Sequence, residues 1–338
     1  MTVHSTYASA GVDIGAGQRA VDLMTKAVRA TYSREVLAGI GAFGGLFDAS
    51  RLKEMEAPVL VASTDGVGTK TKVASKLGRW DTIGCDLVNH CINDILVQGA
   101  EPLFFMDYVA SSHLDAEQIA TVVGGVAAAC RDAGCSLLGG ETAEMPGVYE
   151  AGELDLAGTI IGVVERSKII DGRSIVEGDI VWGLPSTGLH TNGFSLARRV
   201  LADLDWSRQI GNSSIADALL AIHHPYLQAI RKLWSAGVVI KGMAHVTGGG
   251  FVDNLPRILP ENVGAVIKTG SWPILPIFEL IQNHGKIETS EMFHVFNMGI
   301  GMLIVIDASN TSEAIATLTP HIYQVGNIIH GTRNVCIL

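Results

Sequence analysis

The stretch Pro58-Val-Leu-Val-Ala-Ser-Thr-Asp-Gly-Val-Gly-Thr-Lys70 joins a short apolar run to a polar turn that contains two glycines. Residues 58–64 are mostly aliphatic and β-branched, and this composition predicts a buried strand. The residues that follow the strand directly include Asp65, Gly66, Gly68 and Lys70. Because binding and catalytic residues concentrate in loops that rigid elements position, we expect this turn to carry function.

Helices and strands alternate on the C-terminal side of this stretch. Residues 81–98 and 115–132 are predicted as helices, the second with Asp115 as its N-cap and Gly134 as its stop. The predicted strands are 103–110, 136–138 and 154–165, and 139–146 is expected to be a loop. This alternation predicts an α/β first half in which three acidic segments, those of Asp65, Asp94 and Glu141, could converge.

A second α/β unit is predicted after a polar, glycine-containing junction at 167–179. A strand at 179–184 leads into the turn 186–193 and a helix near Phe194. A strand at 243–246 leads into Thr247-Gly-Gly-Gly250 and a helix near Phe251. Both turns would aim helix N-terminal amides at an anion. Further helices are predicted at 273–283 and 312–318, and further strands at 302–306 and 322–329.

The length and composition fit this reading. A chain of 338 residues exceeds what one core normally organises, so we expect two domains, residues 1–166 and 167–338. With 48% hydrophobic and 17% charged residues, the composition favours a compact protein over a disordered or coiled-coil chain.

The charge and the N-terminus limit the partners and the location. A net charge of -10 without a run of basic residues argues against nucleic-acid binding. The N-terminus lacks a signal-peptide pattern and no apolar stretch is long enough to span a membrane, so we expect a cytoplasmic protein. The five cysteines include no Cys-x-x-Cys pair, which favours reduced thiols over disulfides or a zinc site.

Two glycine-rich stretches share letters with nucleotide-binding motifs. Gly39-Ile-Gly-Ala-Phe-Gly44 matches the dinucleotide-binding letters, but no buried strand precedes it and no long helix follows it. We interpret it as a glycine-rich loop that covers a ligand. Gly66-Val-Gly-Thr-Lys-Thr71 resembles a P-loop in letters but not in spacing, so a P-loop site is not predicted.

Three carboxylates are candidate metal ligands. Asp65, Asp94 and Glu141 each lie in or beside a polar or small-residue segment, and Mg²⁺ prefers carboxylate oxygens together with ATP phosphates. The same residues also fit a turn former, a helix-surface charge and a loop charge, and spacing alone leaves both interpretations open.

Two loops of the second half are candidate substrate sites. His190, with Asn192 and Gly193 after it, could polarise or protonate a substrate, or could be an ordinary polar contact. Thr247, Gly248, Gly249 and Gly250 fit a phosphate loop and equally fit a tight turn beside a packed helix. His223-His224-Pro225 lacks partners at metal-ligand spacing and is interpreted as structural.

Several motifs together resemble the phosphoribosylformylglycinamidine cyclo-ligase family over nearly the whole chain. They are Ala10-Gly-Val-Asp-Ile14, Thr64–Lys70, Asn93-Asp94 with Gln98-Gly-Ala-Glu-Pro102, Gly139-Gly-Glu-Thr-Ala-Glu-Met-Pro146, His190–Gly193, Thr247–Phe251 and Phe296-Asn-Met-Gly299. The Asp94 motif is shared with enzymes similar to selenophosphate synthetase and thiamine-phosphate kinase. The full set points more narrowly to the cyclo-ligases.

The resemblance implies two α/β (α+β) domains, each a mixed sheet packed with helices, and a homodimer joined through its N-terminal sheets. It implies that Asp65, Asp94 and Glu141 hold Mg²⁺ on ATP. It also implies that the ATP site is shaped by Gly66, Gly68, Lys70, Gly139 and Gly140. Formylglycinamidine ribonucleotide is expected between the domains, at His190, Asn192 and Thr247–Gly250, with His190 and Lys70 as catalytic residues.

The resemblance also implies a chemistry. ATP would phosphorylate the formamide oxygen, a poor leaving group, and the amidine nitrogen would then attack the activated carbon to close an imidazole ring. Two alternatives remain from the sequence: a small-molecule kinase of the same superfamily, which would release a phosphorylated product without ring closure, and an ATP-binding regulatory or scaffold protein, which would release no ADP in response to substrate.

Overall fold

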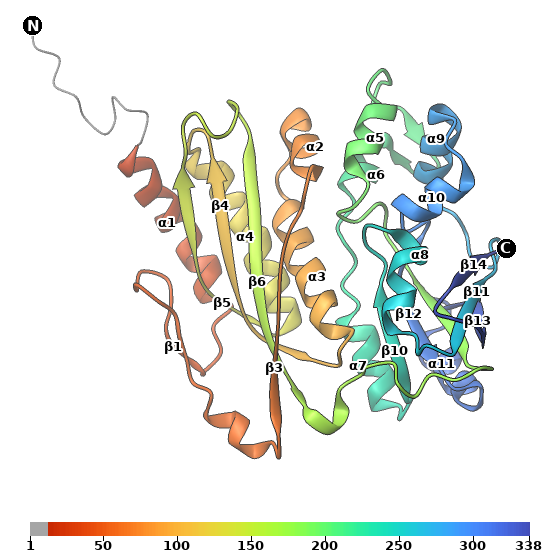
Figure 1. The fold of residues 1–338 in the computed structure, drawn as a ribbon. Helices are drawn as coiled ribbons and strands as arrows, with labels where there is room; N and C mark the ends of the chain where they lie inside the picture. The colour runs from red at the N-terminus through yellow and green to blue at the C-terminus, as the bar shows by residue number, and fades with distance from the viewer. Residues whose placement is uncertain (1–12) are drawn as a thin grey trace, which may run out of the picture. The chain divides into compact units, whose positions relative to one another are not determined.

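The computed structural model describes residues 13–338, so Ala10–Val12 of the first motif lie outside the described residues. The chain forms two compact units (Figure 1). The first contains the described residues up to Ile92 together with Glu101–Glu165. The second contains Asn93–Ala100 and Arg166–Leu338. Among residues 13–338, no helix has the length and apolar character needed to cross a membrane.

A four-stranded mixed sheet forms the centre of the first unit. Its strands, in spatial order, are β3 (Pro58–Gly66), β6 (Leu154–Glu165), β4 (Glu101–Ser111) and β5 (Ser136–Glu144). β4 and β5 pair in parallel, whereas the other pairs are antiparallel. β3 and β5 are therefore the two edges of the sheet.

The helices of the first unit are α1 (Ile14–Arg29), α2 (Lys70–Leu77), α3 (Ile83–Leu96) and α4 (Ala116–Ala133). Asp115 caps the first turn of α4, because its side chain accepts a hydrogen bond from the Gln118 N–H, and Gly134 ends α4 with a φ of 73°. Between α1 and β3 lie the short paired strands β1 (Val36–Ala38) and β2 (Leu46–Phe47) and a 3-10 turn, Ser50–Glu54.

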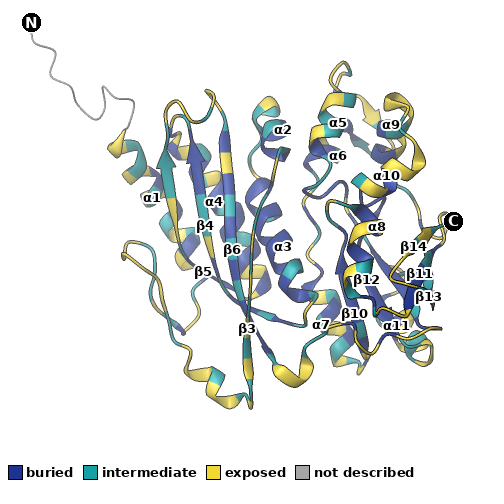
Figure 2. Cartoon of the chain, in the orientation of Figure 1, coloured by how far each residue is buried: buried dark blue, intermediate teal, exposed yellow. Residues whose placement is uncertain are grey.

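The two faces of the N-terminal sheet differ in burial. One face packs on α3, where the Cys91 thiol donates to the Gly158 carbonyl at 3.6 Å, and includes the fully buried Phe105 and Ile160. On the other face Leu60 and Met106 are 63% and 39% exposed. Figure 2 shows half-exposed and exposed segments along these strands. An apolar surface of this kind suits an interface.

A six-stranded mixed sheet forms the centre of the second unit. In spatial order it contains β10 (Ile240–His245), β12 (Ile300–Ile306), β7 (Ile180–Pro185), β13 (Tyr323–His330), β11 (Val263–Ile267) and β14 (Val335–Ile337). Only β11 and β14 pair in parallel. All seven residues of β12 are buried, which agrees with its place inside the sheet.

Short helices surround this second sheet. They are α5 (Phe194–Val200), α6 (Ile215–Leu220), α7 (Leu227–Ser235), α8 (Gly250–Asn254), α9 (Pro276–Gly285), α10 (Thr289–Val295) and α11 (Thr311–Leu318). The small strands β8 (Gln209–Ile210) and β9 (Ser213–Ser214) pair outside the main sheet, and 3-10 turns lie at Arg166–Lys168, Leu255–Ile258 and Ala308–Asn310.

The prediction of two mixed α/β units is confirmed, and one local prediction is wrong. Gly139–Glu144 was expected to form a loop, but it continues β5, because Gly139 to Glu144 pair in register with Met106 to Ser111 of β4. Parallel pairing with a neighbouring strand outweighs the weak strand propensity of Gly139 and Gly140.

Candidate functional site

A cavity of about 860 Å³ lies within the first unit. Its walls come from α1, from the glycine-rich loop 39–45, from α4 and from the edge of the sheet at β4 and β5. The volume is in the range of small-molecule sites. The predicted ATP-site residues Gly139 and Gly140 both line it, and so does the predicted metal ligand Glu141.

Gly140 leaves room for a carboxylate in the wall of this cavity. It pairs with Asp107 of β4, and a Cβ atom at position 140 would lie 2.2 Å from Asp107 Oδ1 and 2.4 Å from the Asp107 carbonyl oxygen. At Gly139 an added Cβ atom would meet no atom within 4 Å. Burial raises the pKa of Asp107 to about 7.

Gly140→Ala is therefore expected to destabilise the first unit, whereas Gly139→Ala is not. The methyl group at 140 must displace backbone as well as side-chain atoms of β4, a change of the overpacking kind that costs about 1–3 kcal/mol. Thermal unfolding measures the effect, and Gly139→Ala is the matched control for stability. Equal melting temperatures for the two variants would contradict this role of Gly140.

Asp65 is held at the other edge of the sheet, near the end of β3. Its Oδ1 accepts a hydrogen bond from the Gly66 N–H at 2.6 Å, and its Oδ2 lies 2.7 Å from His90 Nε2 of α3. The Asp65 side chain is 44% exposed. A fixed and partly exposed carboxylate is suited to a cation.

Asp65 and Glu141 are not brought together within the unit. Asp65 pairs with Gly158, which in turn pairs with Asp107, so these positions lie on the face of the sheet that α3 covers. Glu141 pairs with Tyr108, the next residue of β4, and therefore lies on the opposite face. Three strand spacings also separate the two edges, about 14 Å. One protomer's sheet thus presents these two carboxylates at separate places.

Lys70 lies in the interior of the first unit. Gly68, with a φ of 57°, forms the tight turn that precedes α2, and Lys70 is the first residue of that helix. Lys70 Nζ lies 2.7 Å from Asp86 Oδ2, and neither side chain has any exposed surface. Burial lowers the pKa of Lys70, while Asp86 opposes that shift. In this conformation the ammonium faces Asp86, so the predicted contact with a phosphate stays a prediction that requires this pair to open.

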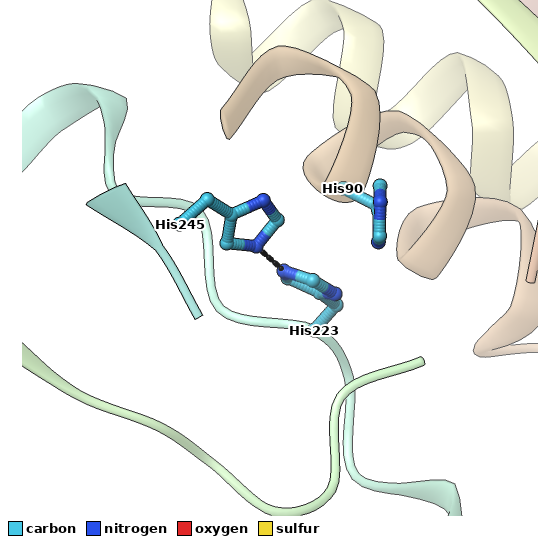
Figure 3. Close-up of side chains that lie close together, drawn as sticks. All are labelled: His90, His223 and His245. Atoms are coloured by element: carbon cyan, nitrogen blue, oxygen red, sulfur yellow. Dashed lines mark hydrogen bonds between the residues drawn. The ribbon is translucent and has the colours of Figure 1, made fainter. Parts of the chain in front are cut away.

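Asp94 takes part in a buried polar chain in the second unit. Asp94 Oδ1 lies 2.8 Å from His245 Nδ1, and His245 Nε2 lies 3.0 Å from His223 Nε2, as the dashed line in Figure 3 shows. His223 Nδ1 lies 3.4 Å from the Thr191 hydroxyl oxygen. His223 and His245 are 0% and 6% exposed. Asp94 therefore contacts a buried histidine and is not simply a solvent-facing charge on a helix surface.

His190 is 1% exposed and has a φ of 62°. Its Nε2 accepts from the backbone N–H groups of Thr187 at 3.3 Å and His224 at 3.4 Å, and its ring stacks on His223 with centroids 4.0 Å apart. These contacts fix the 186–193 loop. Direct contact of His190 with a substrate stays a prediction.

The two predicted substrate loops of the second unit are neighbours. Asn192 Oδ1 lies 3.3 Å from where a Cβ atom of Gly248 would be. The Asn254 amide holds the second loop by donating to the carbonyl oxygens of Thr247, Gly248 and Gly250. Gly249 and Gly250, with φ of 91° and 57°, have the left-handed backbone that this turn requires.

Sequence reasoning missed three polar residues of these sites: His90, Asp107 and His245. His245 stands two residues before Thr247, at the end of β10, and a strand end beside a glycine-rich loop is the signal that could have indicated it. His90 and Asp107 lie within a helix and a strand without a motif, and only tertiary packing reveals their partners. His223, which was interpreted as structural, contacts His190, Thr191 and His245.

Comparisons with known proteins agree over the length of the chain. The family described as AIR synthase related protein, N-terminal domain, matches residues 48–164, and the corresponding C-terminal domain family matches residues 176–338. The phosphoribosylformylglycinamidine cyclo-ligase of Alkaliphilus oremlandii is 47% identical over 341 residues, covering 98% of this chain and 99% of that protein. That of Burkholderia lata is 48% identical over 328 residues, covering 96% and 93%.

A solved structure shares the fold. The hydrogenase maturation protein HypE, in complex with ATP, superposes with a TM-score of 0.70 at 16% identity, covering 96% of this chain and 91% of that one.

Proposed function

Because the chain belongs to the phosphoribosylformylglycinamidine cyclo-ligase family, we propose that the cavity of its first unit holds ATP and that the 190–193 and 247–250 loops hold the ribonucleotide. The enzyme closes the imidazole ring of 5-aminoimidazole ribonucleotide from formylglycinamidine ribonucleotide in purine biosynthesis, with conversion of ATP to ADP and phosphate. The observation that carries the placement of ATP is the cavity enclosed by the glycine-rich loop and by Gly139 and Gly140.

The glycines suit a nucleotide because they let a ligand approach the backbone closely. Gly139 and Gly140 line the cavity on β5, while Gly66 and Gly68 follow Asp65 at the opposite edge of the sheet. The loop 39–45 supplies further glycines on the other side of the cavity. We assign the first pair to the ATP cavity and the second pair to the positioning of the Asp65 carboxylate.

Asp65, Asp94 and Glu141 are the carboxylates that we propose as Mg²⁺ ligands, since oxygen donors suit this hard cation. When bound, Mg²⁺ would offset the charge of the transferring phosphoryl group. The fixed geometry of Asp65, whose two oxygens already meet Gly66 N–H and His90, supports a carboxylate that needs little reorganisation.

We propose a homodimer in which the outer faces of two N-terminal sheets pair. Pairing would cover the exposed side chains of Leu60 and Met106. It would also offer a reason for the separation of Asp65 and Glu141, since carboxylates from two subunits could then serve one ATP.

The reaction that we propose proceeds in two steps. The formamide oxygen attacks the γ-phosphorus of ATP, and ADP departs. The amidine nitrogen then attacks the activated carbon, and the C–O bond breaks to release phosphate. Asn192 and the Thr247–Gly250 loop would hold the substrate so that the nitrogen stays near that carbon, and His190 would fix the loop that presents Asn192.

Labelling the formyl oxygen of the substrate with a heavy isotope tests this route. We expect the label in inorganic phosphate after a single turnover, measured by mass spectrometry, because that oxygen becomes bonded to phosphorus. Label released as water would remove the phosphorylated intermediate. A phosphorylated product without ring closure would indicate the kinase alternative, and absence of substrate-dependent ADP release would indicate a regulatory or scaffold protein.

A further inference from the structure

The cavity of the first unit has two chemically different ends. Hydrogen bonds set the direction of α1 along β5: Asp13 N–H donates to Glu144 at one end, and Leu137 N–H donates to Thr31 just beyond α1 at the other. The lining near Glu144 therefore contains Asp13, Glu141 and Thr142. The lining near Leu137 contains the apolar side chains of Met24, Val28 and Leu138.

Asp107 lies where these two ends meet. Its partner in register, Gly140, stands in the middle of the cavity-lining part of β5, and the carboxylate of Asp107 lies against this glycine. Because Gly140 has no side chain, the Asp107 carboxyl on β4 is part of the cavity wall although β5 forms the edge of the sheet.

This arrangement fixes which end suits which part of a nucleotide. A triphosphate would meet no cation or hydrogen-bond donor among Met24, Val28 and Leu138, whereas a flat aromatic base buries its faces there. Glu141 and its neighbours suit a metal-bound triphosphate. With the base at the apolar end, Asp107 is the carboxyl that its edge would meet.

Building on the proposed ATP site, we propose that Asp107 selects the nucleobase, with its carboxyl accepting a hydrogen bond from the exocyclic amino group of adenine. The corresponding edge of guanine presents a carbonyl oxygen, which cannot donate to a carboxylate. A guanine nucleotide would leave two acceptors facing each other in a partly buried site, which is unfavourable. Asp107 is thus a specificity-determining residue for the known reaction.

The test compares ATP with purine riboside triphosphate, which lacks only the amino group, by calorimetric binding to the full-length enzyme with Mg²⁺ at about pH 9, where Asp107, whose pKa burial raises to about 7, is ionised. We expect the wild type to bind ATP ~10- to 100-fold more tightly, the ratio for one hydrogen bond to a charged group. Asp107→Leu and Asp107→Ala should bind both nucleotides equally. Asp107→Asn should keep the preference, since its amide oxygen still accepts. Asp132→Asn, at the exposed C-terminal end of α4 and outside the cavity lining, is the matched control.

Two results would overturn this inference. One is equal affinity of the wild type for both nucleotides, which needs no variant and so does not depend on how variants fold. The other is a full preference for ATP in either apolar variant that melts at the wild-type temperature. The proposed function is assayed separately, by ring closure with ATP in the wild type. If ring closure with ATP proceeds while the preference for ATP over purine riboside triphosphate does not depend on Asp107, the role of Asp107 is excluded and the proposed function still holds.

Discussion

Lys70→Met is expected to destabilise the protein by about 3–5 kcal/mol, the usual result of removing one partner from a buried ion pair. The loss arises because Asp86 would keep a carboxylate without exposed surface and without its cation at 2.7 Å. Urea unfolding followed by circular dichroism measures it. The double variant Lys70→Met/Asp86→Leu should recover much of the lost stability, because neither member of the pair then leaves a buried charge without its partner.

Lys72→Met is the matched control for this prediction. Lys72 lies two residues further along α2, and its partner is Glu153, but its side chain is 38% exposed. We expect a change of about 0–1 kcal/mol, as for other surface pairs. If Lys70→Met instead kept wild-type stability and lost turnover, Lys70 would leave Asp86 during the reaction, and the predicted phosphate contact would be supported.

Asp65→Asn is expected to lower turnover by ~100- to 1,000-fold with little change in stability, because it removes charge from the proposed Mg²⁺ site, where metal assistance is worth several kcal/mol. Turnover at saturating ATP and Mg²⁺ measures it. Asp171→Asn is the control, since Asp171 also accepts from a nearby backbone N–H and is 45% exposed, but it belongs to the second unit and has no proposed role in the site. Turnover within a few-fold of wild type for Asp65→Asn would exclude this role.

Glu141→Gln extends the test to the arrangement of subunits. If Asp65 of one subunit and Glu141 of the other serve one ATP, a mixed dimer of Asp65→Asn and Glu141→Gln chains contains one native site and one doubly altered site. Random mixing of the two inactive variants should then restore about a quarter of wild-type activity. No recovery, with mixed dimers verified by differential tagging, would place both carboxylates in sites within single subunits.

Sequence patterns predicted most of the strands and helices, because their signals are local. The aliphatic run of 58–64 became β3, and Asp115 and Gly134 bound α4 as predicted. α1 and α7 were not predicted, although each has one apolar face, and the short strands β11 and β14 gave little periodic signal. Gly139–Glu144 was misassigned because its strand conformation depends on β4, which is distant in sequence.

The site could be predicted only in part. Motifs identified Asn192 and Gly248, which the structure places side by side, but they could not show that Asp65 and Glu141 lie on opposite edges of one sheet. The order of strands in a sheet depends on which strands form hydrogen bonds with one another, and the residues of a single motif do not determine that order. The environment of Lys70 was equally invisible, since a basic residue after a glycine turn resembles a phosphate ligand whether or not an aspartate faces it.

The assignment of Asn93–Ala100 to the second unit affects how this gene could be divided or recombined. The chain passes from one unit to the other after residues 92, 100 and 165, so no single cut yields two whole modules. A fragment that starts at residue 167 would lose the Asn93 side chain, which bonds both the His224 carbonyl and the Tyr226 N–H, and would lose the Asp94 partner of His245. Exchange of halves between homologues should therefore succeed only when the end of α3 travels with the C-terminal half.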